Sequence, residues 1–88
     1  MATNVDVTNN DNIGLGGNSS GLYLKVINSE AKGAQNDTLT ITDASLVIAA
    51  LLYDDTTGVI DAATISTNVL TLTTAATGTV SGLVVFQK

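Results

Sequence analysis

Two stretches of the chain alternate threonine with apolar residues, and this pattern constrains the fold more than any other feature. Residues 38–42 read TLTIT and residues 69–73 read VLTLT. Apolar side chains at every second position have the period of a half-buried β-strand, because successive side chains point to opposite faces. Thr favours strands, and its hydroxyl keeps an outward face soluble without a charge. The chain is therefore expected to form sheets with one face on a core.

The same period marks further strands. Residues 22–27 set Leu22, Leu24 and Val26 against Tyr23, Lys25 and Ile27, and the stretch from 79 to 87 also alternates, with apolar residues on both of its faces near Leu83 and Val85. Residues 59–66, VIDAATIS, are interpreted as one more strand. Turns are expected at 54–58, DDTTG, and at the two residues 67–68.

Residues 44–55, ASLVIAALLYDD, are ambiguous between helix and strand. Ala and Leu favour a helix, and Asp43 could cap one. However, the stretch is apolar on every side, which is typical of a short strand buried on both faces. We favour the strand and keep the helix as the alternative.

These strands predict an all-β fold, a small β-sandwich or barrel of about six to seven short antiparallel strands. The domain is expected to span residues 22–88. Residues 1–21 are rich in Asn and Gly and are interpreted as an extended N-terminal arm. Within the arm, Val5 and Val7 alternate with polar residues, which could form an edge strand that pairs only with a partner.

Composition excludes several kinds of chemistry. The 88 residues include no Cys or His, which excludes a thiol nucleophile, an imidazole base, a disulfide and the usual zinc ligands. The net charge is −5 with three Lys and no Arg, so we expect neither nucleic-acid nor membrane binding. A chain of this length buries only about 60% of its surface, so oligomerisation is expected to supplement a thin core.

Three motifs suggest chemistry, and each has a plainer interpretation. Residues 13–21, IGLGGNSSG, look like a phosphate-binding loop but lack the Lys of one. The DTTG at 55–58 is one residue longer than the Asp-Thr-Gly of aspartic proteases and is better explained as a turn. Asp54, Asp55 and Asp61 could be Ca²⁺ ligands, although not at the usual loop spacing. We therefore assign no catalytic residue, metal or cofactor and expect no enzymatic activity.

Residues 36–88 resemble the small β-rich virion proteins of tailed bacteriophages, of the capsid decoration or cement type. The resemblance lies in the order of strand, DDTTG turn, strand and hairpin, with the closing strand GTVSGLVV. It implies a non-enzymatic protein on the capsid surface of a virion, bound to the major capsid protein or another virion protein. It also implies a homo-oligomer, with a trimer favoured.

The contact surfaces are predicted from the apolar residues of the arm and of the closing strand: Val5, Val7, Ile13, Leu15, Leu83, Val85 and Phe86. Deleting residues 1–12 is accordingly expected to weaken partner binding without unfolding the domain. The alternative function is a small carbohydrate- or receptor-binding β-module of a phage tail or fibre.

Overall fold

The computed structural model describes residues 3–9, 12–15 and 21–88. Within these ranges the chain forms nine strands and no helix, and so no helix long and apolar enough to cross a membrane. The strands are β1 (Asn4–Val7), β2 (Asn12–Leu15), β3 (Leu22–Lys32), β4 (Thr38–Ile41), β5 (Leu46–Asp54), β6 (Ile60–Asp61), β7 (Thr64–Ser66), β8 (Val69–Thr71) and β9 (Gly78–Gln87).

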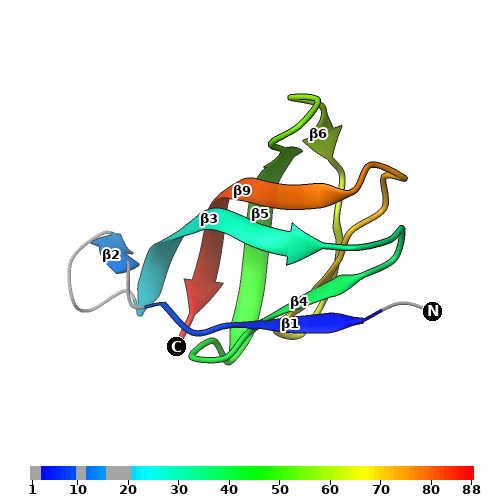
Figure 1. The fold of residues 1–88 in the computed structure, drawn as a ribbon. Coiled ribbons are helices and arrows are strands. Elements are labelled where there is room, and N and C mark those ends of the chain that lie inside the picture. Colours follow the sequence, from blue (N-terminus) through cyan, green and yellow to red (C-terminus); the bar gives the residue numbers. More distant parts are fainter. Residues whose placement is uncertain (1–2, 10–11, 16–20) are drawn as a thin grey trace.

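The strands make two sheets that pack face to face (Figure 1). The four-stranded sheet has the order β1-β4-β8-β7, and the five-stranded sheet has the order β2-β3-β9-β5-β6. Every pairing is antiparallel except that of β1 with β4, which is parallel. The predicted all-β sandwich is confirmed, but the described residues form nine strands in place of the six or seven expected, and β3, β5 and β9 are long, with 11, 9 and 10 residues.

The core lies between the sheets and follows the threonine alternation. Leu39 and Ile41 of β4, with Leu70 of β8 and Leu72 just after it, are fully buried, while the Thr residues between them are only half-buried. The five-stranded sheet contributes the opposing half of the core, including Phe86. The alternation in the sequence therefore identified the inward side chains of both β4 and β8.

Residues 46–54 form β5, which confirms the strand interpretation of the ambiguous segment. The prediction that both of its faces are buried was wrong. Val47 and Leu52 point into the core, whereas Leu46 and Leu51 are about half exposed. The strand carries apolar residues on a face that the other described residues leave exposed.

The region 59–68 also differs in part from expectation. In place of one strand, β6 and β7 are separate short strands that belong to different sheets. The two-residue connection at Thr67 and Asn68 is confirmed, and Thr67 has a φ of 55° that such a tight turn requires.

The predicted division at residue 21 is not reproduced in the described residues. β1 pairs with β4 within the same chain, with Val5 opposite Leu39 and Val7 opposite Ile41. β2 pairs with β3 at the edge of the other sheet. Residues 3–9 and 12–15 are thus parts of the sandwich, and Val7 belongs to its core. Residues 1–2, 10–11 and 16–20 of the predicted arm lie outside the described residues.

Candidate functional site

The outer face of the five-stranded sheet is apolar over most of its area. In β3, Tyr23, Lys25 and Ile27 point inward, so the residues between them point outward. The strand register then aligns outward residues in four cross-strand rows: Leu15–Leu22–Gln87–Leu46, Ile13–Leu24–Val85–Ala49, Val26–Leu83–Leu51 and Ser81–Tyr53–Ile60. We call this surface the apolar face.

A β-bulge adds one more residue to the apolar face. The register of β5 against β9 shifts between Val47 and Ala49. Val47 and Ala50 both point inward, so Ile48 and Ala49 lie together on the outer side. Ile48 is 48% exposed as a result.

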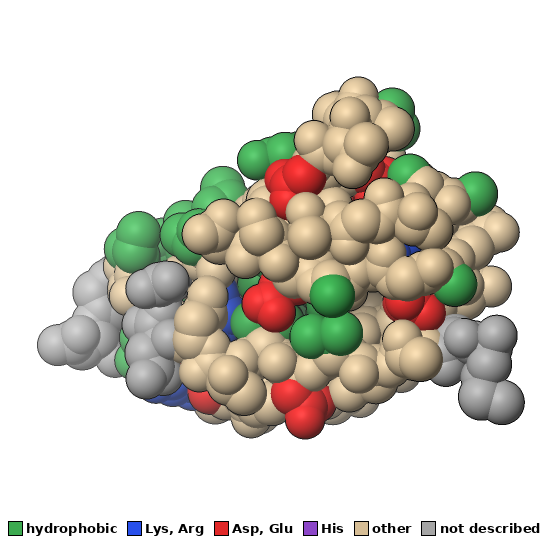
Figure 2. Space-filling model, in the orientation of Figure 1, with side chains coloured by type: hydrophobic (Ala, Val, Ile, Leu, Met, Phe, Trp, Pro, Cys, Tyr) green, Lys and Arg blue, Asp and Glu red, His purple; other side chains and the backbone are tan. Residues whose placement is uncertain are grey.

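Eight large apolar side chains of the apolar face are exposed by 36–60%: Ile13, Val26, Leu46, Ile48, Leu51, Tyr53, Ile60 and Leu83. With about half of roughly 170 Å² exposed on each, they present roughly 700 Å². The largest apolar patch of an ordinary monomer is about 300–600 Å². In Figure 2, hydrophobic side chains gather along the upper left edge, above β3 and β9 of Figure 1. The apolar face is therefore large enough to be an interaction surface.

Four of the seven predicted contact residues lie on the apolar face. Ile13 and Leu83 are exposed, and Leu15 and Val85 are half-buried beside them. The register brings Ile13 and Val85 to the two sides of Leu24, although they are 72 positions apart in the sequence.

The other three predicted contact residues are placed elsewhere. Val7 and Phe86 are fully buried in the core, because both point toward the opposing sheet. Val5 is half-buried and packs against the core from the four-stranded sheet. Val7 and Phe86 thus present no surface to a partner, and the prediction that they are contact residues was wrong.

Sequence reasoning missed the contribution of β5 and β6. The sequence pattern predicts that Leu51 and Tyr53 lie in a strand buried on both faces, and it does not mark Ile60 as a surface residue. The sequence does contain a signal. A strand with one face in water normally carries polar residues on that face, and residues 46–53 include no charged residue, so any exposed face of this strand must be apolar. Only the strand order tells which side of that apolar run is uncovered.

The apolar face ends at a polar cluster around Asp55, directly after β5. Hydroxyls of Thr79, Ser81 and Ser29 all donate to Asp55 Oδ2. The Thr79 and Ser81 hydroxyls lower the pKa of Asp55, and they outweigh desolvation, which raises it. The cluster also fixes a bulge in β3, where Ser29 has a φ of 55° and its N–H donates to Ser81 Oγ.

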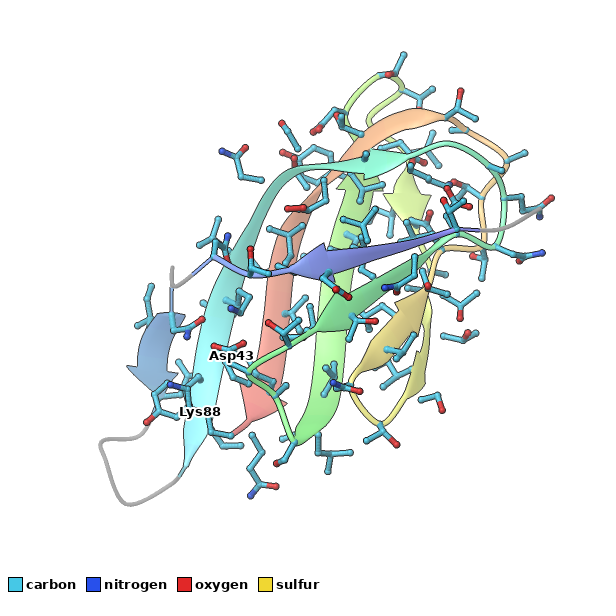
Figure 3. All side chains as sticks on the ribbon, turned by 60° about the horizontal axis from the view of Figure 1, so that its bottom comes forward. Asp43 and Lys88 are labelled. Atoms are coloured by element: carbon cyan, nitrogen blue, oxygen red, sulfur yellow. The ribbon has the colours of Figure 1, made fainter. Side chains whose placement is uncertain are left out.

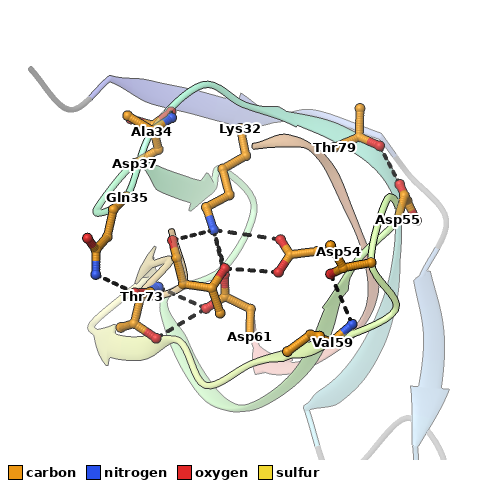
Figure 4. A network of polar contacts seen from close by, with 12 residues as sticks. Lys32, Ala34, Gln35, Asp37, Asp54, Asp55, Val59, Asp61, Thr73 and Thr79 are labelled. Atoms are coloured by element: carbon orange, nitrogen blue, oxygen red, sulfur yellow. Dashed lines mark hydrogen bonds and ion pairs between the residues drawn. The ribbon is translucent and has the colours of Figure 1, made fainter. Parts of the chain in front are cut away.

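A second polar cluster lies between the sheets, with Lys32, Asp54 and Asp61 buried and Thr74 half-buried (Figure 4). Lys32 Nζ lies 3.0 Å from Asp61 Oδ2 and 3.6 Å from Asp54 Oδ1, and it donates to the Thr74 carbonyl at 2.7 Å. The Thr74 hydroxyl lies within hydrogen-bond distance of both the Asp54 and the Asp61 carboxylates, as a donor. Desolvation raises the pKa of Asp61, but the hydrogen bonds from Thr73, Lys32 and Thr74 lower it by a larger amount. The pKa of Asp61 is therefore below its ordinary value. This cluster is a structural tie between β3, β5 and β6.

Lys25 and Asp43 form a third cluster, which fastens the N-terminal strands. Lys25 is fully buried, with Nζ 3.0 Å from Asp43 Oδ1 and 2.6 Å from the Asn9 carbonyl oxygen. Asn12 Nδ2 donates to Asp43 Oδ2. Figure 3 shows Asp43 in the turn that follows β4, and Lys88 at the end of β9. Lys88 is exposed, so two of the three lysines are neutralised inside the domain.

Asp37 is buried and caps the turn before β4. Its carboxylate accepts N–H donors from Thr3, Gly33 and Ala34 at 2.9, 2.7 and 3.1 Å. The backbone donors of Thr3 and Gly33 hold the pKa of Asp37 below its ordinary value. Asp37 thereby ties the segment before β1 to the loop after β3.

The geometry separates the three acids considered for Ca²⁺. Asp54 and Asp61 face the Lys32 ammonium, whereas Asp55 binds hydroxyls at the outer face. Over the described residues there is no pocket, and no three acidic side chains gather where they could hold a metal ion. The polar clusters of the described residues hold the strands together, whereas the apolar face has no such structural role.

Comparison with known proteins adds no relative. No protein-family model matches the chain, and no curated protein or solved structure is significantly similar to it.

Proposed function

We propose that this chain is a non-enzymatic structural protein of a virus particle, of the capsid decoration type, and that it works by assembly. The observation that carries the proposal is the apolar face. An outward sheet surface of this size and composition costs free energy in water and gains it in contact with another protein.

The size of the domain supports an assembly role. A chain of 88 residues has a thin core, and binding to a partner adds stability by mass action. On a symmetric capsid the same weak contact recurs at every site, and a bound oligomer gains avidity from several contacts at once. A small sandwich without enzymatic machinery suffices for that task.

The distribution of charge supports a protein partner. Lys25 and Lys32 are paired with aspartates in the interior, which leaves Lys88 as the exposed cation among the described residues. A surface with this balance repels phosphate backbones and anionic lipids.

Fractionation of virus particles tests the proposal. A lysate of cells that produce the chain is separated on a density gradient, and peptide mass spectrometry locates the chain. We expect it in the fraction of the filled capsid, and we expect particles from a deletion strain to rupture at a lower temperature. Recovery of the chain only as free protein would overturn the proposal, and recovery only with detached tails or fibres would favour the receptor-binding alternative.

A further inference from the structure

The apolar face has the properties of a self-association surface. We propose that a second copy of this chain packs on it, so that the two five-stranded sheets meet face to face. The inference rests on the proposed function in that it names how the assembling unit is built, but it concerns the purified chain and is tested without a capsid.

The available area matches what a stable dimer needs. The apolar face presents roughly 700 Å², and an interface of ordinary size buries about 800 Å² on each partner. Its composition of Leu, Ile, Val and Tyr is that of an interface core, with Ser81 and Gln87 as the polar members of its rows. A contact of this area between two copies would cover nearly the whole apolar face.

The charge pattern favours a second copy as the occupant. Two chains of net charge −5 repel unless their charges lie away from the contact. None of the residues in the four rows is charged, so self-packing over these rows buries no carboxylate. The first acidic side chain, that of Asp55, lies at the end of the apolar face and is engaged by hydroxyls.

The position of Asp55 also selects an arrangement. A face that packs on itself closes as a two-fold dimer, in which each contact occurs twice. With the strands of the two copies running in opposite directions, the two Asp55 carboxylates lie at opposite ends of the interface. With the strands running in the same direction, they meet at one end and repel. The antiparallel arrangement is therefore favoured. In it, the central strand β9 and its residue Leu83 lie near the middle of the interface.

Sedimentation of the purified full chain tests this inference. The wild type is expected to sediment as a dimer at micromolar concentration. Leu51→Lys and Leu83→Lys each place a charge in the contact, and we expect each to raise the dimer dissociation constant about tenfold or more. Ile65→Lys is the matched control, because Ile65 is 41% exposed on β7 of the other sheet while Leu83 is 39% exposed. Circular dichroism verifies that each variant is folded.

A cross-linking measurement covers the case in which a lysine variant fails to fold. The chain has no Cys, so Leu83→Cys and Ile65→Cys each introduce a single thiol. A short bifunctional thiol reagent should join two copies through residue 83 and not through residue 65. A monomeric or trimeric wild type, or equal cross-linking at both positions, would overturn the face-to-face dimer. Such a result leaves the virion proposal standing, whereas absence from particles overturns that proposal and leaves the dimer untouched.

Discussion

Lys32 Nζ lies 3.0 Å from Asp61 Oδ2, and both side chains are fully buried. They come from β3 and β6, which do not neighbour each other in the sheet, and Asp54 and Thr74 complete the cluster around them. A buried charge without a partner is far more costly than a buried pair. The cluster therefore makes the position of β6 depend on β3.

Removal of the Lys32 ammonium is expected to destabilise the domain strongly. Lys32→Met leaves Asp54 and Asp61 as buried carboxylates without their cation, which should cost about 3–5 kcal/mol in urea unfolding. Lys88→Met is the control: Lys88 is exposed, and loss of its cation–π contact with the Tyr23 ring should cost less than about 1 kcal/mol. Adding Asp54→Asn and Asp61→Asn to Lys32→Met should recover part of the loss. Equal stability of the two lysine variants would contradict this account.

Acid is expected to unfold the domain below the ordinary pKa of aspartate. The pKa values of Asp37, Asp43, Asp55 and Asp61 are all lowered from 3.8 by folding. Groups with a lowered pKa stabilise the folded state fully above 3.8, and this stabilisation is lost as the pH falls through their folded pKa values. The melting temperature should be nearly constant from pH 7 to about pH 5 and then fall steeply.

A single variant tests the source of the acid sensitivity. Asp37→Asn removes the carboxylate that accepts the Thr3, Gly33 and Ala34 N–H donors, so it should flatten the dependence of melting temperature on pH below 3.8. The exposed Asp6→Asn variant controls for the loss of one negative charge. An unchanged slope in Asp37→Asn would show that Asp37 contributes nothing to the acid transition.

Gly82 is expected to accept no larger residue. Its φ is 148°, and a Cβ there would overlap the Leu51 carbonyl oxygen and lie 2.9 Å from Leu52 Cα. Gly82→Ala should therefore cost about 2–5 kcal/mol, because β5 and β9 must separate or the backbone must strain. Gly33→Ala is the matched control, with its nearest contact at 3.5 Å, and should change stability by less than about 1 kcal/mol. Similar unfolding curves for the two variants would argue against the close approach.

The structure reverses the expected effect of truncating the N-terminus. Deleting residues 1–12 removes β1, takes Val7 from the core and uncovers the Lys25 ammonium, so the truncated domain should unfold. Val7→Ala should cost about 2–3 kcal/mol in thermal or urea unfolding, and the half-buried Val5→Ala should cost clearly less. A truncated chain that melts like the intact one would show that β1 is dispensable.

Local pattern predicted more of the fold than of the candidate site. The alternation around Leu39 and Leu70 identified two inward strand faces, and Leu83 of the predicted contact residues is exposed on β9. Phe86 has the same apolar character but points inward, because successive side chains of a strand point to opposite faces and its neighbours Val85 and Gln87 point outward. Composition alone does not tell a buried apolar side chain from an exposed one on the adjacent position.

By itself, the sequence determined that this chain is an all-β domain with Thr-lined strands, few charges and neither Cys nor His. These properties follow from residue type and from a period of two, which are local. The tertiary structure decided that β1 enters the sandwich beside β4, that Lys25 and Lys32 are buried, and that the outer side of β5 is left uncovered. The reason is physical: strand order and layer packing join residues far apart in the chain, so only the assembled sheets define which apolar face stays exposed.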